Sequence, residues 1–268
     1  MKQSTKYLDQ DILRQFLNLS AILAAFGINV LANIAPINGL SIGAISNTFF
    51  REVLIVPANY AFAIWGLIYL GLITFGVYQV LPAQRQNPSL RRMGYLFVVA
   101  SLAQIAWVFL FQYRLFTLSL AAMLGILLAL IGIYLRLGIG YERVSKAQKW
   151  FVHIPLSIYL AWISVATITN VAIALYNLGW SGWGISPQVW TAIALITGAA
   201  IAATVSIQRA DIAFTLVIVW AFVAIAVRQA NIPLIALTAA GLAIALIVLL
   251  LLGVLRRRKS SLNSSESS

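Results

Sequence analysis

Three apolar stretches of the sequence carry aromatic and amide side chains at helical spacing, so each set lies on one face of a helix. The sets are Phe62, Trp65 and Tyr69, then Gln104, Trp107 and Phe111, and then Tyr159, Trp162, Ala166, Asn170, Ile173 and Asn177. The last set spans an arc of about 80° in helical projection. Aromatic rings can stack on a planar apolar ligand, and amides are costly against lipid unless they find partners. The three faces together predict one aromatic cavity with a few hydrogen-bonding groups inside a helix bundle.

A simpler interpretation stays open, in which the stripes only pack helices together. Each stripe alone is typical of ordinary helix packing. Trp and Tyr are enriched at the headgroup level of membranes, yet Trp65, Trp107 and Trp162 lie several residues inside their apolar stretches. Under the packing interpretation the protein is a membrane scaffold without a ligand.

The chain lacks the residue sets of many enzymes and carriers. It contains no Cys, which excludes a thiolate metal site and a cysteine nucleophile. Paired carboxylates, a Ser-His-Asp set and a glycine-rich phosphate loop are also missing. No charged residue lies in the middle of an apolar stretch, which disfavours proton pumps and ion-coupled carriers. His153 could ligate haem iron or only form interfacial hydrogen bonds. We therefore expect no catalytic side chain and no metal site, and an enzymatic activity is disfavoured.

The elements that must position these side chains are membrane helices. The 268 residues are 62% hydrophobic and 9% charged, whereas a soluble domain is about 25% charged. A helix needs roughly 20 apolar residues to cross the bilayer, and continuous apolar runs indicate helices rather than barrel strands. The sequence predicts an all-α polytopic bundle of about eight spans, at residues 16–34, 60–80, 93–111, 116–135, 155–176, 189–207, 212–227 and 234–255.

The basic residues support this segmentation. With eight spans, all but three of the 18 Lys and Arg residues fall on the side of the two termini, and the exceptions are Arg51, Arg114 and Arg228. Lys and Arg are retained on the cytoplasmic side, so we expect both termini in the cytoplasm, in a plasma membrane or an internal photosynthetic membrane. The net charge of +12 is then explained by Lys and Arg residues that set the orientation of the helices during insertion. No nucleic-acid partner is expected.

The motifs resemble the TspO/MBR family of tryptophan-rich sensory proteins. Pro57, Phe62, Trp65 and Tyr69 are similar to the family's P…F-x-x-W-x-x-L-Y element. The sequence from Tyr159 to Trp180 resembles its fifth-helix pattern Y-L-x-W-x-x-x-A-x-x-x-N…N-x-G-W without a gap. The third span is similar to N-W-x-W…F-F and departs from it at two positions, where Gln104 replaces the Asn and Ile105 replaces the first Trp.

The resemblance covers residues 16–183 and implies a five-helix bundle that binds porphyrins, other haem-pathway tetrapyrroles or sterol-like lipids. It implies a pocket open toward the long loop after the first span. No cofactor is required, and a porphyrin or haem would be a bound ligand. The ligand-binding residues that it implies are Trp65, Tyr69, Gln104, Trp107, Phe111, Tyr159, Trp162, Ala166 and Asn170. The changes at positions 104 and 105 leave the choice of ligand open.

The predicted organisation is an N-terminal segment (1–15), the TspO-like unit (16–183), three additional spans (184–255) and a basic, then Ser-rich cytoplasmic tail (256–268). In the additional spans, Gly198 with Ala202 and Gly241 with Ala245 predict close helix packing, in the bundle or in a homo-oligomer. The predicted partners are the lipid bilayer and a tetrapyrrole or lipid ligand.

The leading functional hypothesis is binding of a tetrapyrrole or sterol-like lipid for sensing, sequestration or transport. An alternative is light- or oxygen-dependent breakdown of a bound porphyrin. In that alternative the chemistry would belong to the pigment, with Trp and Tyr as electron donors.

Overall fold

The computed structural model describes residues 2–266, with side chains described for residues 10–253 and 255. Within these residues the chain is helical and contains no strand, which confirms the all-α prediction. The eight long helices are α1 (Lys2–Ile34), α3 (Ile64–Val80), α5 (Leu96–Gln112), α6 (Phe116–Arg136), α8 (Ile154–Asn177), α9 (Pro187–Arg209), α10 (Ile212–Arg228) and α11 (Pro233–Glu266). The short elements are α2 (Ile42–Phe49), α4 (Pro88–Met93), α7 (Lys146–Gln148), the 3-10 turns η1 (Asn59–Ala63), η2 (Pro82–Gln84) and η4 (Gly182–Gly184), and the π-helical turn η3 (Lys149–His153).

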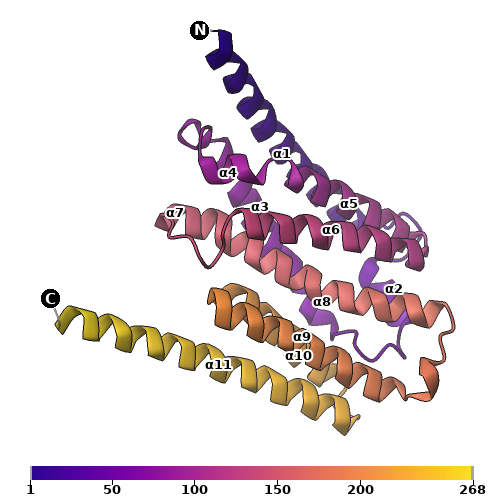
Figure 1. Cartoon of the computed structure of the whole chain (residues 1–268). Coiled ribbons are helices and arrows are strands. Elements are labelled where there is room, and N and C mark those ends of the chain that lie inside the picture. The colour runs from indigo at the N-terminus through magenta and orange to yellow at the C-terminus, as the bar shows by residue number, and fades with distance from the viewer. Residues whose placement is uncertain (1, 267–268) are drawn as a thin grey trace.

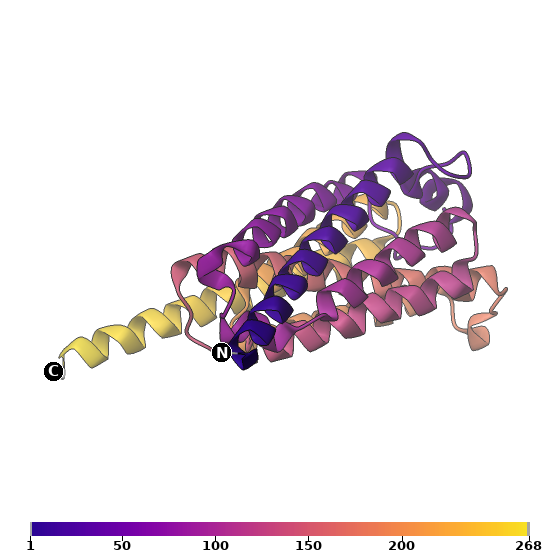
Figure 2. The ribbon, with the colours of Figure 1, turned by 90° about the horizontal axis from the view of Figure 1, so that it is seen from above.

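Each long helix corresponds to one predicted membrane span. Six of them are long and apolar enough to cross a bilayer, α3 when it is counted together with η1, while α5 and α10 are apolar helices of 17 residues each. A helix of that length extends about 25 Å, slightly less than the hydrocarbon thickness. The protein is therefore an integral, multi-pass membrane protein. The long helices run side by side, and the start of α1 and the end of α11 lie at the same end of the bundle (Figure 2). We call this the termini end, and the opposite end, with residues 35–58 and 178–186, the loop end.

The helices form two groups that meet at α8 (Figure 1). In the first group α1 packs on α3 and α5, α5 on α6, and α6 on α8. In the second, α9, α10 and α11 pack on one another, and α10 lies against α8 and η1. The second group thus continues the bundle across α8.

Two helices begin at positions that differ from the starts of the predicted spans. Met93 ends α4 rather than starting the third span, because Gly94 breaks the chain with a φ of 60°, and α5 begins at Leu96. This φ lies in a region that favours glycine. The fifth span begins before residue 155, because α7 and η3 lead into α8 without a break.

The two pairs of small residues behave differently. A Cβ on Gly198 would lie 3.3 Å from Phe222 of α10, and Ala202 is fully buried. This pair lets α9 approach its neighbour closely, which confirms the packing prediction. Gly241 and Ala245 are exposed on α11, so they do not pack within the chain. Their part in a homo-oligomer stays a prediction.

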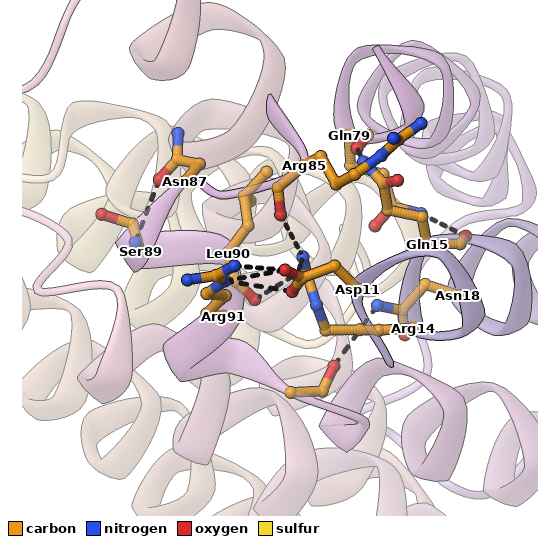
Figure 3. Close-up of polar contacts among 11 residues, drawn as sticks. Asp11, Arg14, Gln15, Asn18, Gln79, Arg85, Asn87, Ser89, Leu90 and Arg91 are labelled. Carbon is orange, nitrogen blue, oxygen red and sulfur yellow. Dashed lines mark hydrogen bonds and ion pairs between the residues drawn. The ribbon is translucent and has the colours of Figure 1, made fainter. Parts of the chain in front are cut away.

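A buried charged cluster fastens α1 to the connection around α4 at the termini end (Figure 3). Arg14 is 4% exposed. Its Nη1 donates to the Leu90 carbonyl at 3.0 Å, and its Nη2 donates to the Arg85 carbonyl at 3.0 Å and to Asp11 Oδ1 at 3.2 Å. Arg91 pairs with the same Asp11 carboxylate. One acidic group thus joins two guanidinium groups from separate segments.

Other polar pairs at this end join further segments. Gln15 Nε2 donates to the Gln79 carbonyl, and Gln79 Nε2 donates to the Gln15 carbonyl at 3.1 Å, which ties α1 to α3. On the surface, Arg92 donates to both carboxylate oxygens of Glu142 at 2.8 and 2.7 Å. These hydrogen bonds hold the pKa of the Glu142 carboxyl below its usual range.

Candidate functional site

The three predicted faces turn toward one another near the loop end and enclose a cavity of about 50 Å³, which we call the aromatic cavity. Six of the nine ligand-binding residues that the resemblance implies line it, namely Trp65, Trp107, Phe111, Trp162, Ala166 and Asn170. The rest of the helical wall consists of Phe62 of η1, Met123 of α6, and Val165, Thr169 and Ile173 of α8. Ile42, Ser46, Val56 and Pro57, from α2 and the segment after it, close the cavity on the loop side.

Paired aromatic rings form the wall of the cavity. Trp107 stacks on Phe111, one turn further along α5, with ring centroids 5.1 Å apart. Phe62 meets Trp162 edge to face at 6.0 Å. Such pairs are worth about 0.5–1.5 kcal/mol beyond their buried area. The rings are therefore held in place by one another before any ligand arrives.

Three predicted site residues lie behind this wall as a hydrogen-bonded triad. Gln104 Nε2 donates to the Tyr69 hydroxyl at 2.6 Å, and the Tyr159 hydroxyl donates to Gln104 Oε1. All three side chains are buried, and none lines the aromatic cavity. The ring of Trp65 lies 5.5 Å from that of Tyr69 and 6.2 Å from that of Tyr159. The triad therefore packs against Trp65 and supports its ring. The polar groups of the triad are hydrogen-bonded to one another.

Several polar atoms around the cavity have no such partner. Trp107 Nε1, Trp162 Nε1 and Thr169 Oγ1 are buried and find no hydrogen-bond partner among the described residues, and all three residues line the cavity. Leaving a buried donor unpaired costs about 1–3 kcal/mol. Asn170 differs from them, because its Oδ1 accepts from Ser119 Oγ of α6 at 3.2 Å. Three unpaired groups around one hollow are typical of a site that receives hydrogen-bond acceptors from a ligand.

A second hollow of about 480 Å³ adjoins the aromatic cavity. It shares Ile42, Phe62 and Trp65 with the cavity, and its other walls are mainly polar. Four asparagines line it, namely Asn29 and Asn33 of α1, Asn47 of α2 and Asn59 of η1. We call this hollow the polar vestibule.

Two arginines hold the rim of the vestibule at Asn47. Arg228 Nη1 donates to Asn47 Oδ1 at 3.2 Å, and Arg51 Nε donates to the Asn47 carbonyl at 3.1 Å. Neither guanidinium forms an ion pair with any described carboxylate. The vestibule therefore has a basic rim.

We call α2 and the segment after it, residues 42–61, the cover of the cavity. Its second half is anchored by α10. Gln229 Nε2 donates to the Leu54 carbonyl at 2.9 Å, Arg228 Nη1 to the Pro57 carbonyl at 3.2 Å, and Trp220 Nε1 to the Ala61 carbonyl at 3.2 Å. The backbone N–H of Ala58 donates to the Ala224 carbonyl at 3.1 Å. These bonds hold residues 54–61 against the second group of helices. The helices after residue 183 thus contact the site indirectly, a role that no sequence motif indicated.

Sequence reasoning missed two kinds of lining residue. Val165 and Thr169 of α8 lie next to the predicted arc, and a wider arc would have included both, whereas Ile173 belongs to the arc and lines the cavity as expected. Ile42 and Val56 belong to the cover, where helical periodicity gives no signal. His153, considered as a haem ligand, lies at the termini end of the α8 segment and lines neither hollow.

Comparison with known proteins agrees with this architecture. A family model described as TSPO-like protein matches residues 15–252, and the match includes α9, α10 and most of α11. No curated protein and no solved structure matches the chain. Because the family model covers most of the sequence, the chain belongs to the TSPO-like family.

Proposed function

We propose that the protein binds a flat, largely apolar tetrapyrrole in the aromatic cavity and the polar vestibule, for sensing, sequestration or transport. The observation that carries this proposal is the set of unpaired donors of Trp107, Trp162 and Thr169 around one aromatic hollow. None of the residues that line the cavity is acidic, basic or a histidine. This composition favours binding over acid–base catalysis.

The size of the cavity indicates how such a ligand would enter. A cavity of about 50 Å³ accommodates only a few water molecules, whereas ligand sites usually measure about 300–1,000 Å³. Ile42 of α2 separates the cavity from the vestibule together with Phe62 and Trp65. Displacement of α2 would join the two hollows into one site of adequate size. Binding is thus expected to be coupled to movement of the cover.

The charge of the vestibule favours a tetrapyrrole over a sterol. Porphyrins of the haem pathway carry carboxylates on one edge, whereas a sterol carries one neutral hydroxyl. Carboxylates would find amide donors in the vestibule and the guanidinium groups of Arg51 and Arg228 at its rim. The apolar part of the ring would then face the indoles.

A fluorescence titration tests the proposal. Protoporphyrin IX should quench the tryptophan emission of the detergent-purified protein with saturation on the order of micromolar. Trp107→Phe combined with Trp162→Phe removes both unpaired indole N–H groups and keeps an aromatic wall, and should weaken binding by about tenfold. The control combines Trp150→Phe with Trp183→Phe, which removes two exposed indoles and should leave the affinity unchanged.

Two outcomes would overturn the proposal. The first is equal affinity of the cavity variant and the control variant for protoporphyrin IX. The second is displacement of the porphyrin by cholesterol at equal or lower concentration, which would assign the site to a neutral lipid. Displacement by haem and not by cholesterol is the expected result.

A further inference from the structure

A separate apolar groove lies between α8 and α9 at the loop end, outside the proposed tetrapyrrole site. Its volume is about 420 Å³, within the range of about 300–1,000 Å³ typical of ligand sites. Ile168, Ala172 and Leu175 of α8 form one wall, and Ile193 and Ala194 of α9 form the other. Both helices are candidate membrane spans, so the environment of this groove is the bilayer rather than water.

The groove changes character along its length. Its deep part is lined mainly by aliphatic residues, with the Thr197 hydroxyl paired to the Ile193 carbonyl, whereas Tyr176, Trp180, Ser181 and Trp190 lie near its end at the membrane surface. Ile168 and Tyr176 are eight positions apart on α8, which corresponds to about 12 Å along the helix axis. Trp and Tyr are enriched at the headgroup level of membranes. This gradient matches an amphiphile whose chain lies along the helices and whose head lies at the surface.

Glu52 gives the polar end of the groove a negative charge. It lines the groove beside α8, and its Oε2 accepts a hydrogen bond from the Tyr176 hydroxyl at 3.1 Å. It forms no ion pair with any described basic residue, and its neighbour Arg51 donates to the Asn47 carbonyl. The indoles of Trp180 and Trp190, with ring centroids 5.1 Å apart, line the same end. An unpaired carboxylate beside indole rings is complementary to an ammonium group.

We propose that this groove binds a long-chain amphiphile with an ammonium head, drawn from the surrounding leaflet. One hydrocarbon chain occupies the wall between α8 and α9, and the ammonium group lies beside Glu52 and the two indoles. The proposal does not depend on the tetrapyrrole site, because Trp107 and Trp162 do not line this groove.

Photolabelling in lipid nanodiscs tests the site. The probe is an alkyltrimethylammonium with a diazirine in its chain, and a second probe carries the same chain on a neutral alcohol. After irradiation, mass spectrometry should place the label on α8 and α9 residues of the groove, with the ammonium probe favoured by about threefold to fivefold.

Three variants separate the proposal from general lipid exposure. Ala194→Phe fills the groove and should remove most of the labelling, whereas Ala200→Phe, on the exposed face of α9, should leave it unchanged. Glu52→Gln keeps the groove and should abolish the preference for the ammonium probe. It alters an exposed side chain, so it tests the proposal even if Ala194→Phe fails to fold. Equal labelling over the whole lipid-facing surface, or an ammonium preference retained in Glu52→Gln, would overturn the assignment.

Discussion

Two buried polar regions, the cluster around Arg14 at the termini end and the aromatic cavity toward the loop end, differ in how their polar groups are paired. At the termini end, Arg14 donates to two backbone carbonyls and a carboxylate and joins segments that are distant in sequence. Toward the loop end, Trp107 Nε1, Trp162 Nε1 and Thr169 Oγ1 belong to residues that surround a hollow, and these atoms have no hydrogen-bond partner among the described residues. Six atoms at the termini end also lack partners among the described residues, but none of their residues lines a hollow described above; they belong to Arg14, Asn18, Gln79, Arg85, Gln148 and His153. The cluster around Arg14 therefore joins segments of the fold, whereas the groups around the aromatic cavity are the ones that we propose to bind a ligand.

The largest effect on stability is expected at the termini end. Arg14→Ala removes two hydrogen bonds that join α1 to the segment around α4 and a third to Asp11 within α1, and should lower the free energy of unfolding by about 3 kcal/mol. Unfolding of the detergent-purified protein by dodecyl sulfate measures this change. Arg143→Ala, at an exposed loop position, is the control and should have little effect. An Arg14→Ala protein as stable as the control would contradict a structural role for this end.

A smaller effect on stability is expected at Gln104, which forms hydrogen bonds with both Tyr69 and Tyr159 behind the aromatic wall. Gln104→Leu leaves the hydroxyls of Tyr69 and Tyr159 without their shared partner and should cost about 2 kcal/mol of folding stability. Gln86→Leu, at an exposed turn position, is the control for the added hydrophobic side chain. Porphyrin affinity should fall less than in the Trp107→Phe, Trp162→Phe variant, because Gln104 does not line the cavity. A loss of affinity without a loss of stability would instead make Gln104 a direct ligand contact.

The sequence predicted the fold well because the bilayer restricts a chain of this composition to helices. Apolar run length placed all eight long helices, and helical periodicity placed Trp162, Ala166 and Asn170 on the face that lines the cavity. The misplaced start at Met93 has a local cause, since only the backbone conformation of Gly94 shows where one helix ends and the next begins.

The site itself was less accessible to sequence reasoning. Whether Gln104 faces a ligand or bridges two tyrosines depends on the relative register of α3, α5 and α8, which no single helix encodes. The anchoring of the cover pairs Ala58 with Ala224, a contact between segments whose separation in sequence gives no periodic signal. Whether the indole N–H groups of Trp107 and Trp162 find hydrogen-bond partners depends on all the side chains packed around them, which the pattern of a single helix does not specify.

The smallest change in stability is expected at Thr169, and this position separates the two uses of polar groups most clearly. Thr169→Val removes a buried hydroxyl that has no partner and keeps the shape of the side chain, so the protein should be as stable as the parent or slightly more stable. Protoporphyrin IX affinity should fall about threefold, because one donor to the ligand is lost.

Thr167→Val on the same helix is the matched control. Its hydroxyl donates to the Ile163 carbonyl at 2.7 Å and does not line the cavity, so its loss should cost about 0.5–1 kcal/mol of stability and leave the affinity unchanged. If the two valine variants lose stability equally and bind the porphyrin equally, the hydroxyl of Thr169 serves folding like that of Thr167, and the contrast between the two ends of the bundle does not extend to this residue.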